Sequence, residues 1–300
     1  MSKRKAPEAT TKPADQMDVD DEDDSGSDDD DDKSLLNVDF EWFPPNESVD
    51  FHGLKTLLRQ LFDVDNQLHE LSSLTNLILS QSHIGSTVKC DGEESDPYAF
   101  LTALPLSHLR PKHHVLQTLG TYFLSRSQSS TSPGLAETLA TLLDEGSNAN
   151  IGLILTERFI NMPHQIIPPL YTMLRSELSS AISSEPQFKF THFLFLSKTY
   201  TEVASQLDAE DAQPSKKSKK DNQAAGKGEV FYFHPEDEVL QRFAVVSGAF
   251  EYEKQGEEGA SDAKRAFQDL GVRPQGLIMV IEAARFEKAV EAVVEYLSGE

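Results

Sequence analysis

The stretch "NIGLILTERFINMPHQIIPPLYTML", residues 150–174, decides the fold of this chain. Its first ten residues are almost continuously apolar, which predicts a strand in a sheet that is covered on both faces. A loop with one histidine follows, and Pro168 and Pro169 favour the first turn of a helix, where a missing N–H costs little. The stretch therefore predicts a buried strand, a stiff loop and a helix in succession.

Strands and helices alternate in the same way along the rest of the chain. Before the stretch, "NVDFEWF" (37–43) alternates apolar and polar residues as a strand does, and "FHGLKTLLRQLF" (51–62) repeats leucine at helical spacing. After it, "FKFTHFLFLSKTYTEV" (188–203) predicts a strand, and "QGLIMVIEAARFEKAVEAVVEYL" (275–297) predicts a strand and an amphipathic helix. Interleaved elements predict a single α/β domain over residues 35–300, a mixed twisted sheet with helices on both faces.

Two segments lack the apolar residues that a core needs. Residues 1–32 hold 13 Asp/Glu against 4 Lys/Arg, so we expect residues 1–34 to form a disordered acidic tail. Residues 208–228, with "KKSKK" near their centre, are expected to form a flexible basic internal loop. The net charge of the whole chain is −23. Such a chain is a poor general binder of nucleic acid and suits a basic protein partner.

Composition also bears on compartment and chemistry. A lone cysteine, Cys90, excludes a disulfide within one chain. The sequence has no apolar run of some twenty residues and no signal-peptide pattern, so we expect neither a membrane span nor secretion. Neither a phosphate-binding loop nor a Gly-x-Gly-x-x-Gly motif occurs, and the adjacent His113 and His114 would diverge by about 100° on a helix. We assign no catalytic, cofactor-binding or metal-binding residue.

The loop after the central strand allows two interpretations. Glu157, Arg158 and His164 could form an acid–base set. Alternatively, the strand ends in a salt bridge and the loop presents a fixed surface to a partner. We favour the second interpretation, in which Arg158, Asn161, Met162 and His164 are the candidate partner contacts and His164 transfers no proton.

Four segments carry a resemblance to a known family. They are "FEWFPPNESVDFHGLKTLLRQLF", "GSTVKCDGEESDPYAFLTALPL", "ILTERFINMPHQIIPPLYTML" and "FYFHPEDEVLQRFA". Together they resemble the BCCIP family of eukaryotic nuclear proteins, from about Val38 to the carboxy terminus. The resemblance implies a fold like that of the GNAT acetyltransferases. Those enzymes hold the pyrophosphate of acetyl-CoA on a glycine-rich helix start. "QTLGTY" (117–122) and "RPQGLI" (273–278) are near misses that cannot form this cradle.

The resemblance implies a non-enzymatic nuclear chaperone or adaptor. Its client would be a basic large-subunit ribosomal protein or another basic protein, and its roles would be ribosome biogenesis, protein transport and nuclear export with nuclear transport receptors. The alternative is an acetyl-CoA-dependent N-acetyltransferase with an atypical cofactor site. Two basic clusters fit nuclear localisation with shuttling to the cytoplasm. Their residues are Lys3, Arg4, Lys5, Lys216, Lys217, Lys219 and Lys220.

Overall fold

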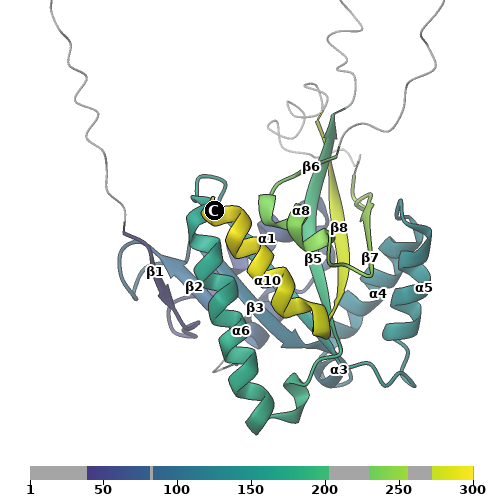
Figure 1. Cartoon of the computed structure of the whole chain (residues 1–300), viewed down its shortest axis with the longest axis horizontal. Helices are drawn as coiled ribbons and strands as arrows, with labels where there is room; N and C mark the ends of the chain where they lie inside the picture. The colour runs from purple at the N-terminus through teal and green to yellow at the C-terminus, as the bar shows by residue number, and fades with distance from the viewer. Residues whose placement is uncertain (1–38, 82–83, 203–229, 256–271, 300) are drawn as a thin grey trace, which may run out of the picture. The chain divides into compact units, whose positions relative to one another are not determined.

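An eight-stranded sheet forms the centre of the computed structural model (Figure 1). The structure describes residues 39–81, 84–202, 230–255 and 272–299, so the predicted tail and basic loop lie outside the described residues. The strand order is β1-β2-β3-β4-β5-β8-β7, and β6 also pairs with β5. The strands are β1 (Glu41–Phe43), β2 (Ser86–Lys89), β3 (Ala99–Pro105), β4 (Ile151–Arg158), β5 (His192–Glu202), β6 (Val230–Tyr232), β7 (Val246–Phe250) and β8 (Val272–Glu282).

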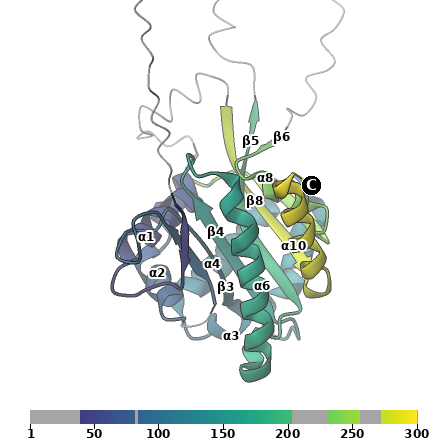
Figure 2. The ribbon, with the colours of Figure 1, turned by 60° about the vertical axis from the view of Figure 1, so that its left-hand side comes forward.

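Helices cover both faces of this sheet, as the sequence predicts (Figure 2). One face carries α1 (Phe51–Phe62), α2 (Leu71–Leu79), α3 (Leu106–Leu109), α4 (His114–Gln128) and α5 (Pro133–Leu142). The other carries α6 (Ile167–Ser184), α8 (Pro235–Gln241) and α10 (Ala283–Ser298). Among the described residues, no helix combines the length and apolar character that a membrane span requires.

Strand β4 is buried throughout, and its first five residues are apolar because each face of the strand meets a different core. Leu153 and Leu155 are buried in the core beneath α1 and α4, whereas Ile154 is buried in the core beneath α6 and α10. Side chains of a strand alternate between faces, so a strand covered on both sides needs apolar residues at successive positions. Helix α6 begins at Ile167 with Pro168 in its first turn, as predicted.

The sheet is mixed because β4 and β5 run parallel, while the other neighbouring strands are antiparallel. The pairing between β4 and β5 covers only Ile151–Ile154 and His192–Phe195. Farther along, β5 pairs instead with β6, through Thr199–Thr201. The two central strands therefore part from Leu155 onward, and this divergence positions the site described below.

The two edge strands of the sheet, β7 and β1, differ in the contacts on their outer sides. At β7, the Thr131 N–H donates a 3.0 Å hydrogen bond to the Ala249 carbonyl, and Ser130 and Ser132 pack against Gly248. At β1, whose partner is β2, no other described backbone pairs with the strand. One edge is thus covered by the connection between α4 and α5, and the other is open as far as the described residues go.

The contact between Gly276 and Phe250 gives a test of the fold. The two residues are opposite each other on β8 and β7, and a Cβ at position 276 would lie 2.1 Å from the Phe250 ring. We expect Gly276→Ala to lower the free energy of unfolding by about 1–3 kcal/mol, because the buried ring must move. Urea denaturation measures the change. The control is Gly134→Ala in α5, whose new Cβ would meet its nearest neighbour at 3.9 Å; equal destabilisation by both variants would contradict this packing.

Candidate functional site

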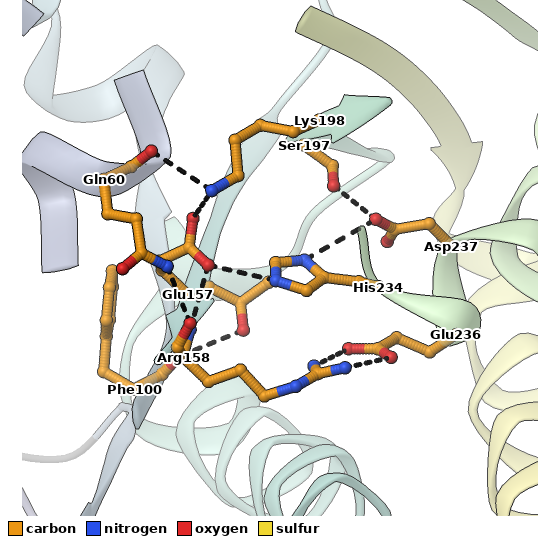
Figure 3. A network of polar contacts seen from close by, with 10 residues as sticks. Gln60, Phe100, Glu157, Arg158, Ser197, Lys198, His234, Glu236 and Asp237 are labelled. Atoms are coloured by element: carbon orange, nitrogen blue, oxygen red, sulfur yellow. Dashed lines mark hydrogen bonds and ion pairs between the residues drawn. The ribbon is translucent and has the colours of Figure 1, made fainter. Parts of the chain in front are cut away.

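Charged side chains fill the gap where β4 and β5 part (Figure 3). Glu157 and Arg158 are the last residues of β4, and Lys198 comes from β5. His234, Glu236 and Asp237 come from the segment that follows β6 and from α8. We call these six residues the buried network, since the side chain of each is at most 8% exposed.

Glu157 is the centre of the buried network. One carboxylate oxygen lies 2.5 Å from the Lys198 Nζ, and the other lies 3.0 Å from the His234 Nε2. The Lys198 ammonium also donates to the Gln60 carbonyl at 3.1 Å, and the Gln60 amide donates to the Arg158 carbonyl at 2.8 Å. One buried carboxylate thereby links β4, β5, α1 and the start of α8, where the strands no longer pair with each other.

Arg158 and Asp237 extend the network on the α6 side. The Arg158 guanidinium contacts both carboxylate oxygens of Glu236, one of them at 3.1 Å. The Ser197 hydroxyl donates to Asp237, whose carboxylate lies 3.8 Å from the His234 Nδ1. The Arg158 guanidinium therefore pairs with Glu236 across the structure, while the Arg158 backbone N–H donates to Glu157 at 3.1 Å.

The network shifts the pKa of several of its members. Burial alone would raise the pKa of Glu157, but its hydrogen bond with His234 and the charges of His234 and Lys198 lower it to about 2. Burial would lower the pKa of His234, and the hydrogen bond and charge of Glu157 outweigh burial and raise it. Burial raises the pKa of Asp237 to about 7, against the charge of His234. Glu157 is held as a carboxylate by two cationic neighbours.

The polar groups of the buried network bond to one another. The Ser197 hydroxyl donates to Asp237, and the His234 Nε2 lies 3.0 Å from a Glu157 oxygen. Two surface hollows, of about 400 and 340 Å³, lie next to the start of α2 and along α6, and neither is lined by a member of the buried network. Among the described residues, no group of three or more His, Cys, Asp or Glu could hold a metal ion. The arrangement ties the strand ends together.

The four predicted contact residues do not share one environment. Arg158 is buried and paired with Glu236, so it is not available to a partner in this structure, and its predicted surface role needs correction. Asn161 and His164 are exposed, and Met162 is half-buried against the α6 core. The predicted nuclear-localisation residues lie outside the described residues.

Sequence reasoning missed two features of this site. One is Ile160, which follows Phe159 and has 86% of its surface exposed. The other is the pairing of Glu157 with Lys198 and His234. A lysine in the middle of the apolar run "FLFLSKTY" was the available signal, because a charge in a doubly covered strand requires a buried partner. Nothing in the sequence says which carboxylate that partner is.

We expect Glu157→Gln to lower the free energy of unfolding by about 3–5 kcal/mol at neutral pH, because Lys198 and His234 would keep buried charges without their carboxylate. Urea denaturation of parent and variant measures the loss. The matched control is Glu287→Gln on α10, an exposed carboxylate, which should change stability by less than about 0.5 kcal/mol.

The pH dependence of the free energy of unfolding gives a second test of the Glu157→Gln prediction. The folded pKa of Glu157 is lower than its ordinary value of 4.5, so its contribution is present above pH 4.5 and is lost as the pH falls toward 2. The raised pKa of His234 acts in the opposite direction, with a contribution present below pH 6.5 and lost at higher pH. The difference in the free energy of unfolding between the parent and Glu157→Gln should therefore become smaller in acid. A constant difference from pH 7 to pH 3 would contradict the role of the carboxylate.

Comparison with known proteins places the chain among relatives of matching length. The family model described as BCCIP matches residues 35–240. "Protein bcp1" of Emericella nidulans is 53% identical over 88% of this chain and 89% of its own length, and "Protein bcp1" of Schizosaccharomyces pombe is 43% identical over 88% and 92%. A solved structure, "Crystal structure of BCP1 from Saccharomyces Cerevisiae", is 26% identical with a TM-score of 0.59, over 91% of this chain and 96% of that one. The chain therefore belongs to the BCCIP family.

Proposed function

We propose that this chain is a non-enzymatic chaperone or adaptor that binds a basic client protein. The proposal rests on how charges are distributed at one end of the sheet, where cations are buried and carboxylates are exposed. Three cations there, Lys89, Arg158 and Lys198, are buried and paired with carboxylates. The turn between β2 and β3 instead exposes four carboxylates, which we call the acidic turn. They are Asp91, Glu93, Glu94 and Asp96.

The acidic turn lies at the same end of the sheet as the loop after β4. Ala99 pairs with Arg158, and the Phe159 N–H donates a 3.0 Å bond to the Tyr98 carbonyl, so the residues that precede β3 lie beside those that follow β4. Ile160, which is exposed, and the acidic turn therefore lie at the same end of the sheet. A basic surface with an apolar pocket complements such an arrangement, since carboxylates speed and orient the encounter and an apolar anchor contributes contact area.

The alternative function, acetyl transfer, finds less support. A GNAT-like fold remains part of our proposal, and it would need both an opening for the cofactor and a helix start for the pyrophosphate. Buried side chains occupy the gap between β4 and β5. The glycines of the two near-miss motifs, Gly120 and Gly276, lie inside α4 and inside β8, so neither stands in a loop before a helix. These observations favour a binding role over catalysis.

Family resemblance supplies the finer part of the proposal. The client would be a basic large-subunit ribosomal protein, escorted during ribosome biogenesis, and nuclear transport receptors would carry the chain between nucleus and cytoplasm. The carboxylates of the acidic turn act over about 8 Å at physiological salt. The client must therefore approach closely before it is attracted, which fits a short-range docking partner.

Neutralising the acidic turn tests this function. We expect the full-length variant Asp91→Asn/Glu93→Gln/Glu94→Gln/Asp96→Asn to bind the client roughly 30-fold more weakly at low salt, on the basis of ~0.5 kcal/mol for each exposed charge. Mass spectrometry of proteins that co-purify with the chain identifies the client, and calorimetry measures its affinity.

The matched control removes four exposed carboxylates elsewhere, with Asp144→Asn, Glu145→Gln, Glu287→Gln and Glu295→Gln. An equal loss in both variants would show that net charge alone acts. Saturable micromolar binding of acetyl-CoA to the purified chain would overturn the non-enzymatic proposal.

The proposed nuclear address rests on the two basic clusters. Alanine at Lys3, Arg4 and Lys5 together with Lys216, Lys217, Lys219 and Lys220 should reduce nuclear accumulation, because import receptors bind short basic clusters. Fluorescence microscopy of the tagged chain measures the ratio of nuclear to cytoplasmic signal. An unchanged ratio would remove these clusters from the import route.

A further inference from the structure

We propose that the outer edge of β1 binds an extended basic segment of the client, which adds a strand to the sheet. This inference rests on the proposed function and names the surface and the conformation by which the client is held. It starts from the open edge of β1 and from the charges on either side of it.

The hydrogen-bond pattern tells which backbone groups of β1 point outward. The Val88 carbonyl accepts a 2.8 Å bond from the Tyr98 N–H, so the backbone polar groups of Val88 face β3. Because these groups alternate in direction along a strand, those of Thr87 and Lys89 face β1. Val88 pairs with Trp42, and therefore the N–H and C=O of Trp42 point away from the sheet. No described backbone group bonds to them.

The two faces of this edge differ in character. Glu41 is exposed and lies opposite Lys89, whose ammonium is buried 2.6 Å from Asp50. Lys89 is thus already neutralised, and Glu41 has no ion pair among the described residues. On the opposite face, Trp42 packs half-buried against the α6 core, with its indole N–H directed at the Ile166 carbonyl at 3.4 Å.

This geometry specifies the sequence pattern of the added strand. The residue opposite Trp42 would form backbone hydrogen bonds with it and place its side chain on the apolar face. The residues on either side would turn their backbone groups away and place their side chains on the face of Glu41. Opposite charges stabilise such cross-strand neighbours, so the segment should alternate apolar and basic residues.

A second copy of this chain fits the edge less well. Self-pairing would bring Asp39 and Glu41 toward the same carboxylates of the partner, and like charges destabilise a sheet. It would also place Pro44, which has no N–H, in the new ladder. The acidic residues therefore disfavour pairing of the edge with itself and favour a basic strand.

The test uses the full-length chain and a nine-residue peptide that alternates lysine and valine, beginning and ending with lysine. Fluorescence polarisation measures its affinity, together with two forms methylated on backbone nitrogens, at all valines or at all lysines. We expect methylation at valine to weaken binding at least about tenfold, because those N–H groups face β1. Methylation at lysine should change affinity by less than about threefold. Hydrogen exchange at the Trp42 amide should slow when the unmodified peptide binds.

Charge variants complete the test. Glu41→Lys should weaken peptide binding several-fold, whereas Glu295→Lys, with the same change of charge on α10, should not. Tighter peptide binding after Lys216, Lys217, Lys219 and Lys220 are replaced by glutamine would show that the chain's own basic segment takes the edge, and would overturn the client assignment.

The outcome also separates this inference from the function on which it rests. If the co-purified client binds but both methylated peptides bind alike, the edge proposal is wrong and the acidic client-binding function stands. If the chain binds neither the client nor the peptide, the function itself fails.

Discussion

The ion pairs of Glu157 hold this fold together at the point where its sheet would otherwise open. Beyond Leu155 the two central strands no longer share backbone hydrogen bonds, and side chains take over the connection. A buried carboxylate is tolerated only when cations and donors surround it. Lys198 and His234 supply both, and Gln60 links the same point to α1. The cost of desolvating these charges makes the arrangement strict, since losing one partner leaves another charge buried alone.

The same pairing leaves the acidic balance of the chain, a net charge of −23, unchanged. Three cations are buried, and each forms an ion pair with one buried carboxylate. They are Lys89, Arg158 and Lys198. Carboxylates that have no such partner, as in the acidic turn, remain in water. Because one carboxylate is buried with each of these cations, the pairs do not alter the net charge of the surface. The proposed function rests on this distribution, since an exposed acidic surface favours a basic partner over nucleic acid.

Local patterns in the sequence predicted most of the fold and little of the site. The apolar run of β4 and the prolines before α6 act on their own neighbours, so their outcome could be read from the chain. The surface role predicted for Arg158 was wrong because its partner, Glu236, lies 78 positions farther along the chain. Alternation along a strand tells which residues share a face, but it does not tell what covers that face. The exposure of Ile160 depends on the same missing information.

The long ladder between β5 and β8 has a consequence for how the chain folds as it is made. Eleven residue pairs join the two strands, from His192 with Glu282 to Glu202 with Val272. Contacts between residues so far apart in sequence form slowly, because a large loop must close first. Strands β2, β3, β4 and the start of β5 can pair while synthesis continues, but the β8 side of β5 must wait for nearly the whole chain. Until then one side of an apolar strand is unpaired, and the chain is most prone to aggregate in this interval.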